Sequence, residues 1–83
     1  MFARKPRDPG RKVDEDAFIS MKGEFAAVKC RVRQLSRDGA ELHYESPREL
    51  ASHFRLKIAR TGITKRCAVV SRKGSQVDVL FLN

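Results

Sequence analysis

Residues 26–35 show the most regular alternation of apolar and charged side chains in the chain. The apolar positions fall on one side of the pattern and the basic positions on the other: Val28, Cys30 and Val32 against Lys29, Arg31 and Arg33. A period of two is typical of a β-strand with one buried side and one solvent-facing side. The pattern therefore predicts a strand here, with its basic side chains pointing outward.

Further short alternating or apolar runs follow, each bounded by residues that favour turns. The runs cover 17–21, 40–44, 54–58, 65–72 and 77–81, and the turns fall at 22–24, 36–39, 61–62 and 73–75. Gly39 is expected to adopt a positive φ and so to let the chain reverse tightly. Short strands at this spacing indicate an antiparallel barrel or sandwich, and closure into a barrel removes exposed edges. We therefore expect an all-β fold, a small six-stranded antiparallel barrel.

The first residues of the chain lack this alternation. Pro6 and Pro9 remove backbone donors and fix φ, and Gly10 adds conformational freedom. We therefore expect a flexible basic arm over residues 1–12 and the barrel over residues 13–83.

Two polar segments predict local structure of other kinds. The acidic run 14–16 is expected to form a solvated turn that neutralises neighbouring arginines. In the segment 46–51, Ser46, Pro47 and Glu49 match a helix-capping pattern, which predicts a single helical turn.

The charge is strongly basic and unevenly placed. Eighteen Lys and Arg against ten Asp and Glu give a net charge of +8, and residues 1–12 hold five of the basic residues and one acidic residue. Such an excess predicts attraction to anions, namely nucleic acids, nucleotides or acidic membranes. No apolar stretch approaches the roughly 18 residues of a membrane helix, and no signal peptide is visible. With Cys30 and Cys67 inside apolar runs, we expect reduced core cysteines, a cytoplasmic location and no membrane insertion.

Catalytic chemistry finds no support in the residue pattern. His43 and His53 stand ten residues apart, with no third ligand at metal spacing, and both are expected at the surface or at a strand edge. No arrangement of serine or cysteine with histidine can be assembled. We therefore expect a protein that is not an enzyme and that has no metal and no cofactor.

Anion recognition is easier to place. Arg7 and Arg11 lie on the arm, and two guanidinium groups there could grip a phosphorylated ligand, although the spacing alone also fits a basic tail. A second polar group lies in the turn that follows the first alternating strand: Gln34, Ser36 and Gly39. By itself this second group is also consistent with a simple hairpin turn.

Taken together, the Arg-x-x-x-Arg arm and the polar-x-Ser-x-x-Gly-Ala turn resemble the PilZ domain family. The similarity continues through Gly-Ala-Glu-Leu, Phe-Arg-Leu-Lys-Ile, Cys-Ala-Val-Val and the closing Val-x-Val-x-Phe. PilZ domains are six-stranded barrels that bind cyclic di-GMP in bacteria. The resemblance implies that Arg7 and Arg11 hold phosphates and stack on guanine, and that the turn of Gln34, Ser36 and Gly39 contacts a guanine. It also implies a receptor module whose ligand-ordered arm signals to a downstream protein partner.

Three positions depart from the family pattern. Gln34 stands where the family usually has Asp or Asn, Ser71 where tryptophan is common, and Asp78 where a glycine is expected. One alternative is therefore a degenerate PilZ domain that does not bind the nucleotide.

A small basic barrel that binds RNA or single-stranded DNA is a second alternative. The outward basic residues of two strands would contact the nucleic-acid backbone: Lys29, Arg31 and Arg33 on one strand, and Arg55 and Lys57 on the other. Tyr44 is the lone candidate for a surface aromatic on which a base could stack, and this scarcity makes nucleic acid the less favoured partner.

Overall fold

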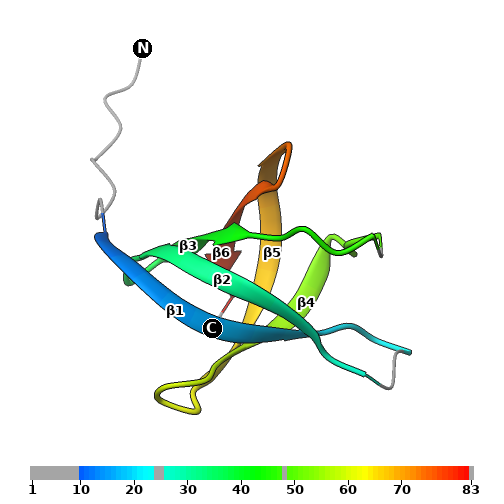
Figure 1. The fold of residues 1–83 in the computed structure, drawn as a ribbon, viewed down its shortest axis with the longest axis horizontal. Coiled ribbons are helices and arrows are strands. Elements are labelled where there is room, and N and C mark those ends of the chain that lie inside the picture. Colours follow the sequence, from blue (N-terminus) through cyan, green and yellow to red (C-terminus); the bar gives the residue numbers. More distant parts are fainter. Residues whose placement is uncertain (1–9, 24–25, 48, 83) are drawn as a thin grey trace.

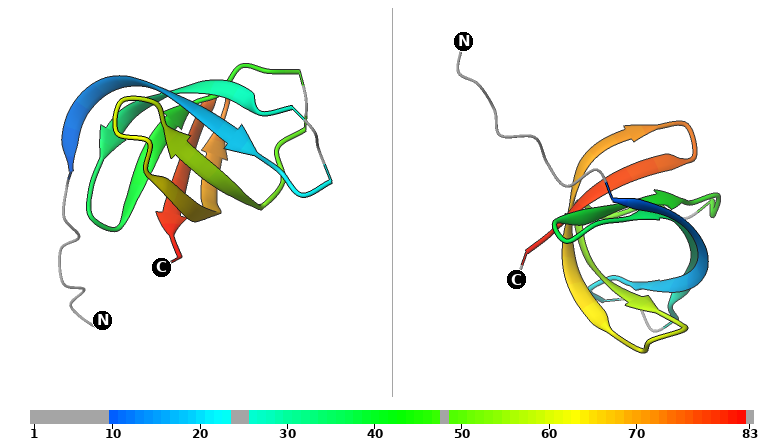
Figure 2. Two further views of the ribbon diagram at one scale, coloured as in Figure 1. Left: turned by 90° about the horizontal axis from the view of Figure 1, so that it is seen from below. Right: turned by 90° about the vertical axis from the view of Figure 1, so that its left-hand side faces the viewer.

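The computed structural model describes residues 10–23, 26–47 and 49–82, which form six strands and no helix. The strands are β1 (Arg11–Ser20), β2 (Val28–Leu35), β3 (Gly39–His43), β4 (His53–Ile58), β5 (Thr64–Lys73) and β6 (Gln76–Phe81). All pairings are antiparallel, and the sheet closes on itself in the order β1-β2-β3-β6-β5-β4 (Figures 1 and 2). The expected six-stranded antiparallel barrel is therefore confirmed.

Strand β1 closes the barrel by pairing with two neighbours. It pairs with β2 from Arg11 to Ile19, and it pairs with β4 through Ala17–Ser20. A bulge between Lys12 and Glu15 interrupts the pairing with β2. Bulges bend a strand and increase its twist, which lets a long strand curve around a small barrel. The first half of β1 borders one end of the barrel, the end at which the β4–β5 turn also lies.

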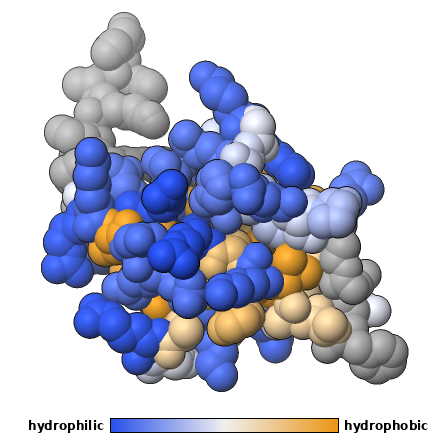
Figure 3. All heavy atoms as spheres, viewed as in Figure 1, coloured by the Kyte–Doolittle hydropathy of each residue, from blue (hydrophilic) through white to orange (hydrophobic). Residues whose placement is uncertain are grey.

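The barrel interior is filled by the inward-facing residues of all six strands. On β2 the expected alternation holds, because Cys30 and Val32 are buried whereas Lys29, Arg31 and Arg33 are exposed. The largest fully buried side chains are Tyr44, Ile19, Leu42, Leu56, Val32, Val77 and Cys67. On the outside, polar and charged side chains cover most of the face in view, with smaller apolar patches between them (Figure 3).

Three local expectations differ from the structure. Strand β1 begins at Arg11, so the last two residues of the expected arm belong to the sheet. The acidic residues 14–16 lie within the same strand and do not form a turn. No helical turn forms among the described residues of 46–51. Within the segment, the Ala51 amide donates to Met21 Sδ at 3.4 Å. On either side of it, the Tyr44 amide donates to Ser75 in the β5–β6 turn, and Ser52 accepts from the Val69 amide on β5.

Two hairpins use glycines in the left-handed region. Gly62, in the β4–β5 turn, has φ 74°, and Gly74, in the β5–β6 turn, has φ 60°. Residues that carry a side chain rarely adopt such φ values, so glycine is favoured at both turns.

Among the described ranges, no helix has the length and apolar character needed to cross a membrane.

Candidate functional site

The β2–β3 turn is held rigidly by Ser36. Its amide donates to the Gly39 carbonyl at 2.9 Å, and its hydroxyl accepts from the amides of Asp38 and Gly39 at 3.2 and 3.1 Å. The Asp38 carbonyl in turn accepts from the amide of Phe81, at the end of β6, at 2.8 Å. The hydroxyl of Ser36 thus organises the turn, and the turn is fixed against the end of the barrel.

Gly39 has a different role from the one expected. Its φ is not positive, so the turn does not need a glycine for its backbone conformation. A Cβ at this position would lie 2.1 Å from the Val79 carbonyl oxygen on β6. Gly39 therefore permits the close approach of β3 to β6, which is a common reason for a glycine in a strand.

The end of the arm reaches the same turn. Gly10 has φ 79°, and a Cβ there would lie 3.0 Å from the Leu35 carbonyl oxygen and 3.1 Å from the Ser36 Cβ. In the sheet register, Arg11 is opposite Leu35 and Lys12 is opposite Gln34. Of the five residues predicted for the site, the structure brings four to this end of the barrel: Arg11, Gln34, Ser36 and Gly39. Arg7 lies outside the described residues.

A cavity of about 490 Å³ opens between the start of β1 and the β4–β5 turn. Glu15 is the acidic residue in its lining, and the Glu15 carboxylate pairs with Arg60 Nε at 3.3 Å. Five basic residues line the cavity: Arg11, Lys12, Arg37, Arg60 and Lys65. Sequence reasoning missed Arg60 and Lys65 because they are far from the arm in the chain and only barrel closure brings them near it.

Gln34 lines a second, shallower cavity of about 350 Å³ on the outer wall. Glu41, on β3, is directly opposite Gln34 and lines the same cavity, together with Lys12 and Arg33. Sequence reasoning did not single out Glu41, since only the strand register shows that it faces Gln34. A carboxylate is therefore available beside the position where the resemblance expected one.

The residues at the other two departures from the family pattern, Ser71 and Asp78, contact each other. Ser71 is opposite Asp78 in the register, at a bulge in β5. The Ser71 hydroxyl donates to Asp78 Oδ2 at 3.0 Å, and the Gln76 amide donates to Oδ1 at 3.5 Å. Asp78 is thus accommodated as a hydrogen-bonded residue on the outer wall.

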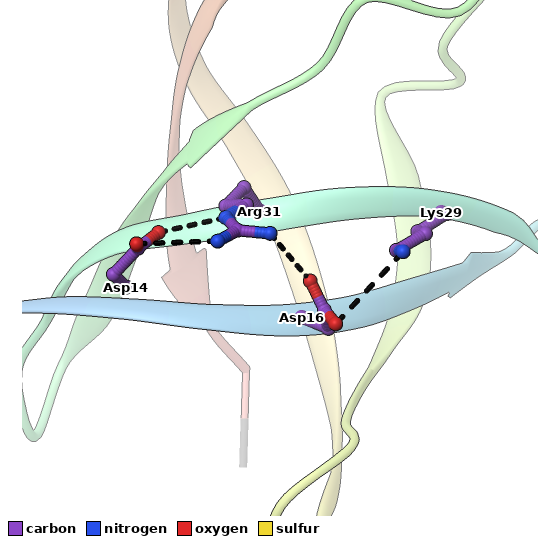
Figure 4. Close-up of polar contacts among 4 residues, drawn as sticks. All are labelled: Asp14, Asp16, Lys29 and Arg31. Carbon is purple, nitrogen blue, oxygen red and sulfur yellow. Dashed lines mark hydrogen bonds and ion pairs between the residues drawn. The ribbon is translucent and has the colours of Figure 1, made fainter.

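The outer face of β1 and β2 carries an ion-pair ladder (Figure 4). Arg31 Nε lies 2.7 Å from Asp14 Oδ1, and Arg31 Nη1 lies 2.9 Å from Asp16 Oδ1. Lys29 Nζ is 3.8 Å from the other oxygen of Asp16. The hydrogen bond from Arg31 lowers the pKa of Asp14, and the same bond raises the pKa of Arg31. The acidic run does neutralise arginine, but it does so across strands.

The aromatic residues are placed differently from the expectation for a nucleic-acid surface. Tyr44 is 1% exposed, and the guanidinium carbon of Arg72 lies 5.7 Å from the centre of its ring. Because Tyr44 packs into the core, it offers no surface for stacking. Phe18, which is 37% exposed to solvent, is the exposed large aromatic residue in the described part of the chain.

The histidines and cysteines take ordinary structural roles. His43 Nε2 lies 3.1 Å from Glu45 Oε2, and His53 is exposed beside Ser52. Within the ranges that the structure describes, no group of three potential metal ligands is present. Cys30 and Cys67 are buried and not bonded to each other, and burial raises their pKa values to about 12 and about 11.

The site thus consists of a rigid polar turn, the end of a basic arm and a cavity bordered by basic side chains. Such an arrangement can bind an anion, because guanidinium and ammonium groups approach it from several elements.

Comparison of the chain with protein-family models, curated proteins and solved structures finds no match.

Proposed function

We propose that this chain is a PilZ-type receptor module that binds cyclic di-GMP in the bacterial cytoplasm and signals to a protein partner. The observation that supports this proposal most directly is the close approach of Gly10 to Leu35 and Ser36. It places Arg11, the second arginine of the Arg-x-x-x-Arg pattern, beside the polar turn. A ligand gripped between arm and turn requires this proximity.

The charge around the turn suits the phosphates of a cyclic dinucleotide. Arginine presents a planar fork of donors that can bond two phosphate oxygens at once. Arg11 and Arg37 come from the β1 and β2–β3 side of the cavity, while Arg60 and Lys65 come from the β4–β5 side. Phosphates entering from the arm would therefore meet cations on both sides of the opening.

Recognition of the guanine edge would involve Glu41 as well as Gln34. Guanine presents two adjacent donors, and Gln34 offers a single acceptor oxygen for them. The carboxylate of Glu41, opposite Gln34 in the same cavity, has two acceptor oxygens. In this proposal Glu41 compensates for the missing Asp or Asn, and the neighbouring Lys12 and Arg33 offset its negative charge.

Signalling would follow from the position of the arm. The arm leads directly into β1, so a ligand held by Arg7, Arg11 and the turn would fix it against this end of the barrel. The change would alter a surface that a downstream protein can bind.

The decisive experiment is calorimetric titration of the intact chain with cyclic di-GMP. We expect a dissociation constant of about 1 μM, which corresponds to about −8 kcal/mol. Arg7→Ala and Arg11→Ala should each weaken binding by about tenfold or more, since each removes charge-assisted hydrogen bonds. Lys73→Ala, which removes an exposed charge near the β5–β6 turn, is the matched control and should bind like the parent. Unchanged affinity in Arg11→Ala would refute the arginine assignment.

Two further variants test the guanine contact. Gln34→Asp should tighten binding because it restores two acceptor oxygens, and Glu41→Gln should weaken it. If neither the parent nor Gln34→Asp binds, the barrel is a degenerate domain that does not recognise the nucleotide. A short single-stranded oligonucleotide tests the nucleic-acid alternative, whose signature is a log–log salt slope near about −0.7 per contacted phosphate.

A further inference from the structure

The outer face of β4 and β5 carries three basic side chains, Arg55, Lys57 and Arg66. Arg55 and Arg66 are directly opposite each other in the register, and Lys57 lies two residues further along β4 on the same face. All three are exposed. Among the described residues, no acidic side chain forms an ion pair with any of them.

The facing pair of arginines is unfavourable in the isolated chain. Side chains directly opposite each other on antiparallel strands lie about 4.5–5.5 Å apart at Cβ, and like charges there are destabilising. The arrangement becomes favourable when an anionic group lies over both guanidinium groups, because each can then donate hydrogen bonds to it. The face is thus suited to a negatively charged partner.

A groove of about 680 Å³ borders this face at Arg55 and Arg66, between the end of β1 and the start of β4, and Lys57 is not part of its lining. Lys22, Arg55 and Arg66 supply positive charge to its lining. Its apolar lining residues are Met21, Phe54, Cys67 and Leu82. Leu82 is 44% exposed, and its amide donates to the Arg66 carbonyl at 2.8 Å, which holds it beside the arginine. Met21, Phe54 and Cys67 are buried, so the groove combines a basic edge with the exposed apolar side chain of Leu82.

We propose that this groove binds an acidic segment of a partner protein, with one apolar side chain of that segment resting against Leu82. A peptide fits better than a single-stranded nucleic acid, because binding of single strands relies on aromatic side chains that stack with bases. Phe54 is buried, and Phe18 lies opposite Lys57 on the β1 side and does not line the groove. The inference does not depend on cyclic di-GMP binding, because the groove contains none of the residues assigned to the nucleotide.

Fluorescence anisotropy with the intact chain tests the proposal. The probe is a short fluorescein-labelled peptide of alternating glutamate and aspartate with one central leucine. Arg55→Glu and Arg66→Glu should each weaken binding by about tenfold or more, as expected for losing a charge-assisted contact and adding repulsion. Lys73→Glu makes the same change in net charge away from the groove, and its affinity should stay within about twofold of the parent. Leu82→Asn should also weaken binding, and so should replacing the peptide's leucine by asparagine.

Three results would overturn the proposal. The first is failure of the peptide to bind the parent chain. The second is equal loss of affinity in Lys73→Glu, which would show attraction to net charge alone. The third is tighter binding of an oligodeoxythymidine that depends on the same two arginines, which would assign the face to nucleic acid. Unchanged titration of Arg55→Glu with cyclic di-GMP separates this groove from the proposed nucleotide site.

Discussion

The two basic outer faces of the barrel differ in how their charges are compensated. On β1 and β2, Arg31 lies between Asp14 and Asp16, and Lys29 is near Asp16 (Figure 4). On β4 and β5, Arg55, Lys57 and Arg66 form no ion pair with any acidic side chain in the described part of the chain. Because Arg55, Lys57 and Arg66 have no carboxylate to pair with, the face of β4 and β5 is the better suited of the two to an anionic partner.

The local sequence patterns of the two faces are alike, so the difference comes from the neighbouring strands. Strand β2 alternates basic and apolar residues, as does β4. Opposite Arg31, β1 places Asp16, whereas opposite Lys57 it places Phe18. The net charge of an outer face therefore depends on the residues of the paired strand as much as on the strand itself.

The largest expected effects concern the interior, which both faces share. Ile19 on β1 and Leu56 on β4 are 0% exposed. Ile19→Ala and Leu56→Ala should each destabilise the barrel by about 2–5 kcal/mol, because each leaves a cavity in a packed core. Urea unfolding monitored by circular dichroism measures both. If Leu56→Ala were nearly neutral, β4 would not belong to the same cooperative core as β1.

Charge reversal should have smaller effects, of opposite sign on the two faces. Arg31→Glu replaces two attractions by repulsion from Asp14 and Asp16, so its urea midpoint should fall, although by less than that of Leu56→Ala. Arg66→Glu removes repulsion from Arg55 and creates an attraction, so its midpoint should stay level or rise. Both midpoints should move back toward that of the parent in high salt, which screens surface charges. Midpoint shifts of the same sign in Arg31→Glu and Arg66→Glu would show that the two faces do not differ in charge compensation.

Acid should weaken the ion-paired face of β1 and β2 but not the face of β4 and β5. The pKa of Asp14 is lowered in the folded chain by its hydrogen bond from Arg31, so this ion pair adds stability at pH values above the ordinary pKa of Asp14. That contribution disappears as the pH falls through the lowered folded value. Arg31→Gln should therefore lose less stability than the parent between neutral and acidic pH. Arg66→Gln, the matched control on the other face, should retain the parent's acid dependence.

The smallest expected effect concerns the two buried cysteines, Cys30 on β2 and Cys67 on β5. Burial raises their pKa values to about 12 and about 11, so their contribution to stability is full below the ordinary value near 9 and is lost as pH rises through the folded values. At pH 8 both thiols should react with a disulfide reagent only after unfolding, since the thiolate is the nucleophile. Rapid labelling of Cys67 alone in the folded chain, measured by mass spectrometry, would contradict the burial of this thiol on β5.

The strands could be predicted from the sequence because alternation is a local property. Residues such as Val28, Cys30 and Val32 report the buried side of a strand whatever its neighbours are. The start of β1 was missed because Asp14, Glu15 and Asp16 resemble a turn in isolation, and only pairing with β2 makes charged residues acceptable there. The prediction of a helical turn after Ser46 was wrong for a similar reason, since nearby backbone groups have partners far away in the sequence: Met21, Val69 and Ser75.

The sequence by itself determined the fold class, the basic charge and the polar turn that follows β2. Only the tertiary structure decided which charges are compensated, since Arg31 meets its carboxylates through the register of β1 and β2. It also placed Tyr44 in the core and gave Gly39 its role as a close contact with Val79. Alternation specifies which side of a strand a residue occupies, but barrel closure specifies which residues it faces. Binding surfaces are made by those facing residues, so they emerge only at the level of the closed barrel.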